Sequence, residues 1–166
     1  MTLVEHVTIS PRDLVLRVAS ATVGASETPA DTNSGPFVEA CQKVTGNKKG
    51  DPWCASWVAR MGVRALGDLW PIEKTGGCQA LHDFGLKHGA IDSAPIAGDI
   101  FLVWHQELGR FAHTGFVVEV LNDGMCRTYE GNTSGAGSRE GWMVAERTRR
   151  FKPSDRFLRW TPMVRQ

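Results

Sequence analysis

The chain has 166 residues, of which 42% are hydrophobic and 22% are charged. This length fits one domain, and the composition is too apolar for a disordered chain. With 19 Lys and Arg residues against 18 Asp and Glu residues, the formal net charge is +1. So small a charge excludes a strong general attraction to nucleic acid or to an anionic membrane surface. We therefore expect residues 1–166 to form a single, monomeric domain with no nucleic-acid partner.

The first residues contain no basic segment followed by a continuous apolar one, and no stretch reaches the roughly 18 apolar residues of a membrane span. We expect a chain made in the cytoplasm without a signal peptide and without membrane insertion. Its cysteines are scattered and form no CxxC pair, so in a reducing compartment they are expected to be free thiols. They are Cys41, Cys54, Cys78 and Cys126.

Helical spacing dominates the first half of the chain. Ser10 as N-cap and Pro11 at the first helical position predict the start of a helix, and Gly24 predicts its end. A short second helix is predicted over residues 36–46, after a loop of small and polar residues. Both helices are expected to pack an apolar stripe on the core.

The stretch "GDPWCASWV" predicts the start of a third helix. Asp51 is the expected N-cap and Pro52 the expected first-turn residue, and the helix is expected to end near Leu66. A fourth, short helix is predicted within residues 76–89, with an interruption at Gly85.

After residue 89 the pattern changes to short β-type runs, two of them joined by the turn signal "NDG". Helices first and an antiparallel sheet second is the α+β pattern. We therefore predict N-terminal helices packed on a C-terminal antiparallel sheet of about five strands. The expected strands lie within residues 98–104, 113–121, 125–132, 141–149 and 156–160.

Cys54 is the first candidate for chemistry, since it falls in the first turn of the third predicted helix. Unpaired backbone N–H groups and the positive end of the helix dipole favour a thiolate over a thiol at this position. The same N–H groups can bind a developing oxyanion. Taken alone, a cysteine in a helix is more often a small buried residue. The nucleophile hypothesis therefore requires an acid–base partner.

Histidine is the side chain best suited to that role near neutral pH. Of the five in the chain, His113 belongs to a predicted central strand, where the sheet can aim its ring. Of the other four, His6 lies in the N-terminal tail and His82 and His88 belong to a predicted helical segment; the fourth is His105.

A third group must fix the tautomer of the histidine and stabilise its charged form. Glu130 and Asn132 lie on the neighbouring strand of the predicted hairpin, and their spacing of two places both on one face. Either can orient His113, and Glu130 is favoured because a carboxylate stabilises an imidazolium better.

A metal-dependent hydrolase is the weakest alternative to a cysteine nucleophile at Cys54. Cys78 and His82 are four residues apart on a predicted helix, and His88 follows, but no second cysteine pair or carboxylate cluster accompanies them. We therefore expect a structural or surface role for these residues, and no metal.

Four blocks occur in the order "DPWCASWV", "PIAGDIFLVW", "FAHTGFVVEV" and "YEGNTSG". In this order the chain resembles the CHAP family, the cysteine, histidine-dependent amidohydrolases/peptidases of the papain-like superfamily. The resemblance covers roughly residues 10 to 160. It implies a papain-like α+β fold with Cys54 as nucleophile, His113 as general base and then acid, Glu130 as orienting group and Asn132 as a polar supporter.

The resemblance also implies a substrate. The family cleaves amide bonds of bacterial peptidoglycan, in the stem or cross-bridge peptide or between muramic acid and L-alanine. Its usual members are phage endolysins, tail-associated lysins and wall hydrolases, so we expect an enzyme that reaches the wall through a holin, a particle or another non-Sec route. Trp53, whose ring can pack on sugars or peptides, and Asn33 are further candidates for the substrate groove.

Two departures from the family are expected. Some members carry a calcium loop before the nucleophile, but the segment "TGNKKGDPWC" offers Asp51 as its only carboxylate, so no calcium and no other cofactor is expected. The chain also has no room for a separate wall-binding domain. Two alternatives stay open: a secreted antibacterial amidase effector, and an inactive wall-binding or tail-structural module.

Overall fold

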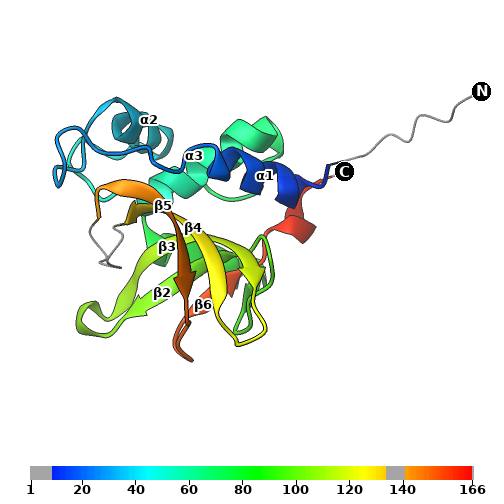
Figure 1. Cartoon of the computed structure of the whole chain (residues 1–166). Helices are drawn as coiled ribbons and strands as arrows, with labels where there is room; N and C mark the ends of the chain where they lie inside the picture. The colour runs from blue at the N-terminus through cyan, green and yellow to red at the C-terminus, as the bar shows by residue number, and fades with distance from the viewer. Residues whose placement is uncertain (1–8, 134–140, 166) are drawn as a thin grey trace, which may run out of the picture.

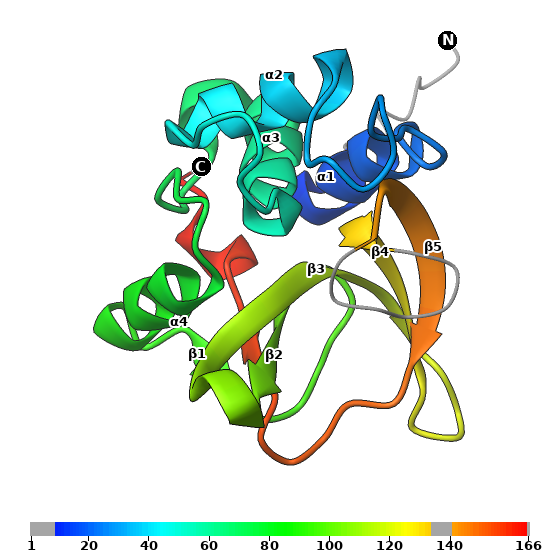
Figure 2. The same cartoon turned by 90° about the vertical axis from the view of Figure 1, so that its left-hand side faces the viewer.

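The computed structural model describes residues 9–133 and 141–165. Helices α1 to α3 lie together on one side of a curved antiparallel sheet, and α4 lies beside the end of the sheet that holds β1 (Figures 1 and 2). This is the predicted α+β architecture. The helices are α1 (Pro11–Ser20), α2 (Pro36–Thr45), α3 (Cys54–Leu66) and α4 (Cys78–Lys87). The strands are β1 (Ile91–Asp92), β2 (Ile100–His105), β3 (Arg110–Val120), β4 (Cys126–Thr133), β5 (Met143–Arg149) and β6 (Arg156–Leu158).

The first two helices begin where the sequence predicts. The hydroxyl of Ser10 accepts a hydrogen bond from the backbone N–H of Asp13, which caps α1 ahead of Pro11. Helix α2 also begins with a proline and ends at Gly46, whose left-handed conformation stops the helix.

The start of α3 differs from the prediction. Asp51 does not cap this helix, because its carboxylate instead accepts a hydrogen bond of 2.8 Å from the backbone N–H of Lys48 and closes the preceding turn. Trp53 is the N-cap, so Cys54 is the first residue of α3 rather than a residue further into its first turn.

The predicted interruption of the fourth helix is wrong, since α4 continues through Gly85. This glycine is buried against the sheet, and a Cβ at its position would lie 2.5 Å from Cδ1 of Ile91 and 2.8 Å from Cδ1 of Leu158. Close packing between helix and sheet therefore accounts for the glycine, not a break in the helix.

The sheet has the strand order β1-β6-β2-β3-β4-β5, with antiparallel pairing between all neighbours. It contains six strands among the described residues rather than about five, because the two-residue strand β1 pairs with β6. Strand β3 also begins earlier than predicted, at Arg110, so His113 lies inside the strand instead of opening it.

Alternate residues of the sheet face two apolar clusters. Ile100 and Leu102 pack with the helices in the larger cluster, whereas Phe101 between them belongs to a smaller cluster on the other side of β2. Phe101 is completely buried there and contacts the His113 ring, with ring centroids 6.0 Å apart. The second cluster therefore packs against the His113 ring, which belongs to the site described below.

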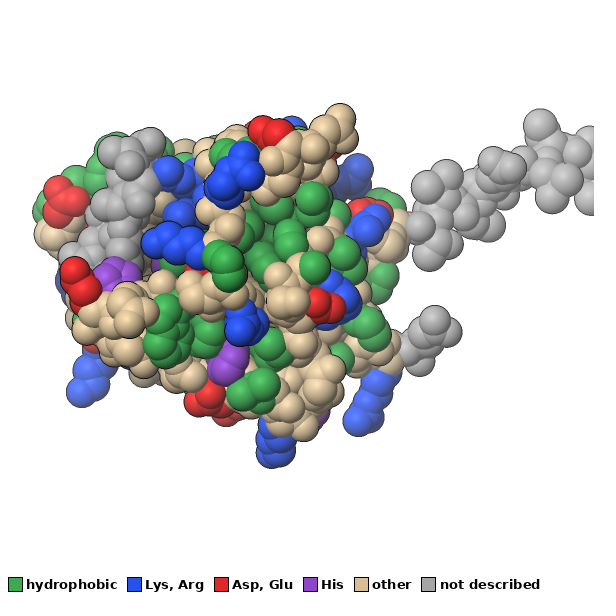
Figure 3. Space-filling model, turned by 90° about the horizontal axis from the view of Figure 1, so that it is seen from below, with side chains coloured by type: hydrophobic (Ala, Val, Ile, Leu, Met, Phe, Trp, Pro, Cys, Tyr) green, Lys and Arg blue, Asp and Glu red, His purple; other side chains and the backbone are tan. Residues whose placement is uncertain are grey.

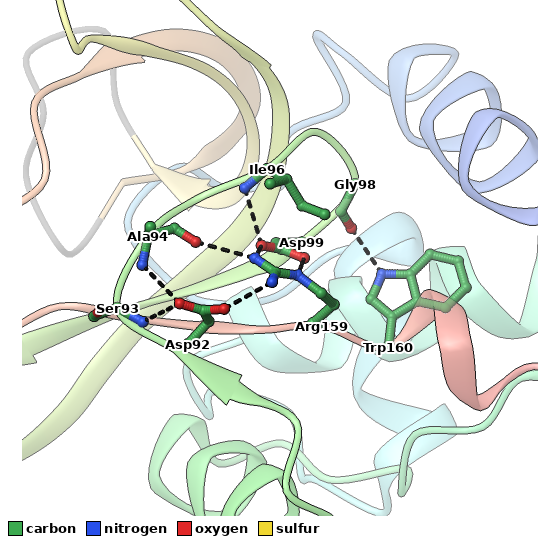
Figure 4. A network of polar contacts seen from close by, with 8 residues as sticks. All are labelled: Asp92, Ser93, Ala94, Ile96, Gly98, Asp99, Arg159 and Trp160. Atoms are coloured by element: carbon green, nitrogen blue, oxygen red, sulfur yellow. Dashed lines mark hydrogen bonds and ion pairs between the residues drawn. The ribbon is translucent and has the colours of Figure 1, made fainter.

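The end of β6 is tied to the loop before β2 by one arginine (Figure 4). The guanidinium of Arg159 pairs with Asp92 at 2.7 Å and with the buried Asp99 at 3.1 Å. Trp160 donates a hydrogen bond of 2.7 Å from its indole to the carbonyl oxygen of Gly98. These contacts fix the turn at residues 98 and 99, which directs the chain into the central strand β2.

No helix in the described ranges is both long and apolar enough to cross a membrane. The face of the molecule seen in Figure 3 carries both basic and acidic side chains, with apolar side chains grouped between them.

Candidate active site

A pocket of about 220 Å³ opens where the first turns of two helices meet the sheet. Cys54 reaches it from the start of α3 and Cys78 from the start of α4. Arg110 on β3 and Asn132 on β4 supply polar groups from the sheet, and Asp51, from the turn before α3, also lines the pocket. The pocket therefore collects side chains from regions far apart in the sequence.

Cys54 combines burial with a local environment that favours negative charge. Its side chain is 4% exposed, and as the first residue of α3 it lies at the positive end of the helix. The adjacent backbone N–H of Ala55 is directed at the sulfur and helps to lower the pKa of the thiol. The sequence predicted this arrangement, because it follows from the position of the residue in the helix.

His113 and Glu130 form a buried pair beside Cys54. Nε2 of His113 lies 2.8 Å from Oε2 of Glu130, and the two side chains are only 5% and 0% exposed. The other ring nitrogen, Nδ1, is buried without a hydrogen bond of normal geometry to any described residue. With Nε2 engaged by the carboxylate, Nδ1 is the nitrogen left to exchange a proton with Cys54.

The carboxylate of Glu130 is saturated with donors. Thr128 donates its hydroxyl to Oε1 at 2.7 Å, and the guanidinium of Arg149 binds both oxygens, with Nη2 at 2.6 Å from Oε2. Burial raises the pKa of Glu130, but the hydrogen bonds and charges of Arg149 and His113 outweigh it, so the net pKa lies well below the ordinary value. Glu130 is therefore a permanent negative charge at neutral pH.

The interaction between Cys54 and His113 shifts both groups toward an ion pair. The pKa of Cys54 is lowered well below 9.0, first by a hydrogen bond with Cys78 and then, against the effect of burial, by His113. Burial opposes charge on His113, but Cys54 and Glu130 raise its pKa to about 9. At neutral pH the arrangement favours a thiolate beside an imidazolium.

Asn132 lies in a bulge of β4. Pairing with β5 passes from Glu130–Ala145 to Thr133–Met143, and Asn132 adopts a positive φ of 55°. The regular alternation predicted for Glu130 and Asn132 is therefore interrupted: Glu130 turns to His113 and Arg149, whereas Asn132 lines the pocket. Oδ1 of Asn132 is buried without a hydrogen bond to the described residues.

The expectation that Trp53 lines the substrate groove is wrong. Its side chain is completely buried, and its indole N–H donates a hydrogen bond of 2.9 Å to the carboxylate of Glu27. Trp53 and Trp57 instead pack beneath Gly131, where an added Cβ would lie 3.0 Å and 2.8 Å from their respective atoms. Trp53 thus supports the bulge from below and does not face the pocket.

Asn33 does not line the pocket either. Its backbone N–H donates a hydrogen bond of 3.0 Å to the carboxylate of Glu27, and its carbonyl oxygen accepts one of 2.9 Å from the side chain of Gln42. Gln42 in turn donates to the carbonyl oxygen of Asp51, just before α3. Asn33 therefore belongs to a hydrogen-bond network that fixes the chain segment before Cys54.

The residues of the metal-site alternative are not brought together. His82 stacks on Phe111 and His88 packs on Phe84, each with ring centroids 4.4 Å apart, while Cys78 faces Cys54. No group of three or more His, Cys, Asp or Glu side chains suited to a metal occurs within residues 9–133 and 141–165. His6 lies outside the described residues.

Two site residues were missed from the sequence, Arg149 and Cys78. A buried carboxylate needs a compensating charge, which is a signal for a nearby arginine, but spacing alone does not select Arg149 from the basic residues of β5. The sequence pattern suggests for Cys78 only the role of a metal ligand. Its sulfur lies 3.7 Å from that of Cys54. This contact joins the first residues of two helices, and no local sequence pattern predicts it.

Comparison with protein families identifies the family of the chain. The model of the CHAP domain matches residues 46–132, slightly more than half of the chain, and this range contains Cys54, His113 and Glu130. No curated protein and no solved structure matches the chain. The chain belongs to the CHAP domain family, whose members are in general amidases or peptidases that act on peptidoglycan.

Proposed function

We propose that this protein hydrolyses an amide bond of bacterial peptidoglycan with Cys54 as the nucleophile, His113 as the acid–base residue and Glu130 as the orienting carboxylate. The observation that carries the proposal is the continuous series from the pocket inward: a thiol at the first residue of α3, the buried imidazole of His113, and a carboxylate 2.8 Å behind it. These are the three groups that a cysteine amidohydrolase requires.

In the first step the Cys54 thiolate attacks the amide carbon, and the new C–S bond pushes the carbonyl electron pair onto oxygen. Backbone N–H groups at the start of α3 stabilise this oxyanion, because they have no acceptor within the helix. Asn132 lines the same pocket and supplies a further polar side chain. The C–N bond then breaks, and His113 gives its proton to the departing amine.

In the second step water hydrolyses the thioester. His113, now neutral, takes a proton from the water as the oxygen attacks the acyl carbon. Breakage of the C–S bond returns the Cys54 thiolate and the His113 imidazolium. Throughout, Glu130 holds the ring orientation and stabilises its positive charge, as the contact with Nε2 allows.

We also propose that the reaction serves lysis of the wall, as in an endolysin or a tail-associated lysin, with the bond lying in a stem or cross-bridge peptide or beside muramic acid. Support comes from the four sequence blocks around Cys54, His113 and Glu130. The 1–166 chain is proposed to act as a single catalytic domain.

The test is digestion of purified peptidoglycan by the wild-type protein and by Cys54→Ala, with the released fragments identified by mass spectrometry. Cys126→Ala is the matched control, since Cys126 is equally buried but lies in the second apolar cluster. We expect release by the wild type and the control but not by Cys54→Ala, and the fragment masses identify the bond. Equal release by Cys54→Ala refutes the mechanism, and no release from walls of several types favours an inactive wall-binding module.

A further inference from the structure

Cys78 is a second thiol in the pocket, with no role in the mechanism above. Its sulfur lies 3.7 Å from that of Cys54, within hydrogen-bonding range for sulfur, and its side chain is 5% exposed. Both cysteines line the pocket, and all four cysteines of the chain are free thiols. The contact therefore joins two unoxidised sulfurs at the reacting centre.

The backbone places Cys78 as it places Cys54. Each cysteine is the first residue of its helix, so the positive ends of α3 and α4 converge on the sulfur pair. Both helices stabilise a negative charge on one sulfur. The other sulfur, which keeps its proton, can then donate a hydrogen bond to the charged one. Two thiolates at this separation would repel each other, so the pair holds one charge.

The charges around the pair indicate which sulfur ionises. Cys54 faces the imidazolium of His113, which Glu130 stabilises from behind. Arg110 on β3 favours a charge on Cys78, but its effect on the pKa is smaller than the opposing effects of Cys54 and of burial. Asp51 is a further charged residue of the pocket lining. The pKa of Cys54 falls, first through its hydrogen bond with Cys78 and then, against burial, through His113. The pKa of Cys78 rises well above 9.0, first through its hydrogen bond with Cys54 and then through burial.

We propose that Cys78 is a positioning residue of the active site, whose thiol donates a hydrogen bond to the Cys54 thiolate in the resting enzyme. The hydrogen bond fixes the position of the Cys54 sulfur in the pocket and stabilises its charge until the amide carbon is attacked. The inference rests on the proposed function only in taking Cys54 as the nucleophile.

The test measures ionisation of Cys54 without any substrate. Alkylation of Cys54 by iodoacetamide is followed against pH, in the presence of a phosphine reductant, with the modified site identified by peptide mass mapping. The proteins compared are the wild type, Cys78→Ala, which removes the donor, and Cys78→Ser, which keeps a donor in a side chain of similar size. Cys41→Ala is the matched control, because Cys41 is a buried helical cysteine outside the pocket.

We expect the wild type and Cys41→Ala to give the same profile, with Cys54 reacting well below the ordinary thiol range. In Cys78→Ala the profile moves to higher pH by about one unit, a tenfold smaller thiolate fraction on the acid side, and the acid limb of kcat/KM moves with it. Cys78→Ser recovers at least half of the shift. His113, Arg110 and Asp51 are unchanged in every variant, so their charges do not account for the difference.

A Cys78→Ala profile identical to the wild type overturns the proposal. It is also wrong if Cys78→Ser shifts the profile as far as Cys78→Ala, since the effect then comes from packing and not from a donor. Thermal unfolding of each variant verifies that the proteins compared are folded. The outcome is separate from the fate of the proposed function, which fails instead if Cys54→Ala keeps full activity on peptidoglycan.

Discussion

Oε2 of Glu130 lies 2.8 Å from Nε2 of His113, and the Glu130 side chain is completely buried. Three described neighbours share this carboxylate: the imidazole of His113, the guanidinium of Arg149 and the hydroxyl of Thr128. The properties of the site therefore depend on this one contact more than on any exposed residue of the pocket.

Substitution Glu130→Gln should narrow the pH range of activity. His113 must carry a proton for the leaving amine, and this proton is lost as pH rises through its pKa of about 9, so kcat/KM of the wild type falls above that value. Without the carboxylate the pKa of His113 moves down toward 6.5, and the alkaline limb moves to lower pH with it. At neutral pH we expect a loss of roughly 10²- to 10⁴-fold in kcat/KM.

The measurement is the pH profile of kcat/KM on a soluble muropeptide. Glu119→Gln is the control, because Glu119 is an exposed residue of β3 that pairs with Arg127 at the surface. An unchanged alkaline limb in Glu130→Gln would show that the carboxylate does not act through His113.

Substitution Arg149→Met should destabilise the fold as well as the site. It leaves a fully buried carboxylate with fewer partners, and removing one member of a buried pair costs about 3–5 kcal/mol of the free energy of unfolding. The control Arg127→Met removes two surface ion pairs, with Glu119 and Glu146, in which all three side chains are more than 40% exposed, and should cost less than about 1 kcal/mol. Urea unfolding of both variants checks the prediction, and equal losses contradict it.

Substitution Gly131→Ala should damage activity by displacing Asn132. Its Cβ would lie 2.8 Å from the Trp57 ring and 3.0 Å from that of Trp53, both buried and unable to move aside. We expect a loss of about 1–3 kcal/mol in the free energy of unfolding and about a hundredfold loss in kcat/KM.

The stability control for this variant is Gly77→Ala, where the nearest atom to an added Cβ is 3.7 Å away, an ordinary contact. Chemical unfolding should separate the two substitutions clearly. Wild-type stability and activity in Gly131→Ala would mean that the tryptophans do not support the bulge.

Local patterns predicted most of the fold. Ser10 and Pro11 specify the start of α1 through capping chemistry that involves only neighbouring residues, and the strands from β2 to β6 follow alternating or apolar runs. The prediction of a break at Gly85 is wrong because a glycine within a helix is typical of either a break or close packing, and only the position of Ile91 distinguishes the two. Strand β1 is too short to leave a pattern.

The site was predicted only as far as each residue can be recognised by its own type and position. Cys54, His113, Glu130 and Asn132 are brought together as expected, although their catalytic roles remain predictions. Trp53 was assigned to the groove because an indole suits a sugar face, whereas its contact with Glu27 depends on a distant loop. Arg149 and Cys78 enter the site through tertiary contacts alone, as the contact between the Cys78 and Cys54 sulfurs illustrates.

The most direct test of the account is detection of the covalent intermediate on Cys54. A soluble muropeptide is mixed with the enzyme, the reaction is stopped with acid at short times, and the protein is mapped by mass spectrometry. The account predicts an acyl group attached to the peptide that contains Cys54, removable by hydroxylamine and absent from Cys54→Ala. An acyl group on another residue, or wild-type turnover by Cys54→Ala, would contradict it.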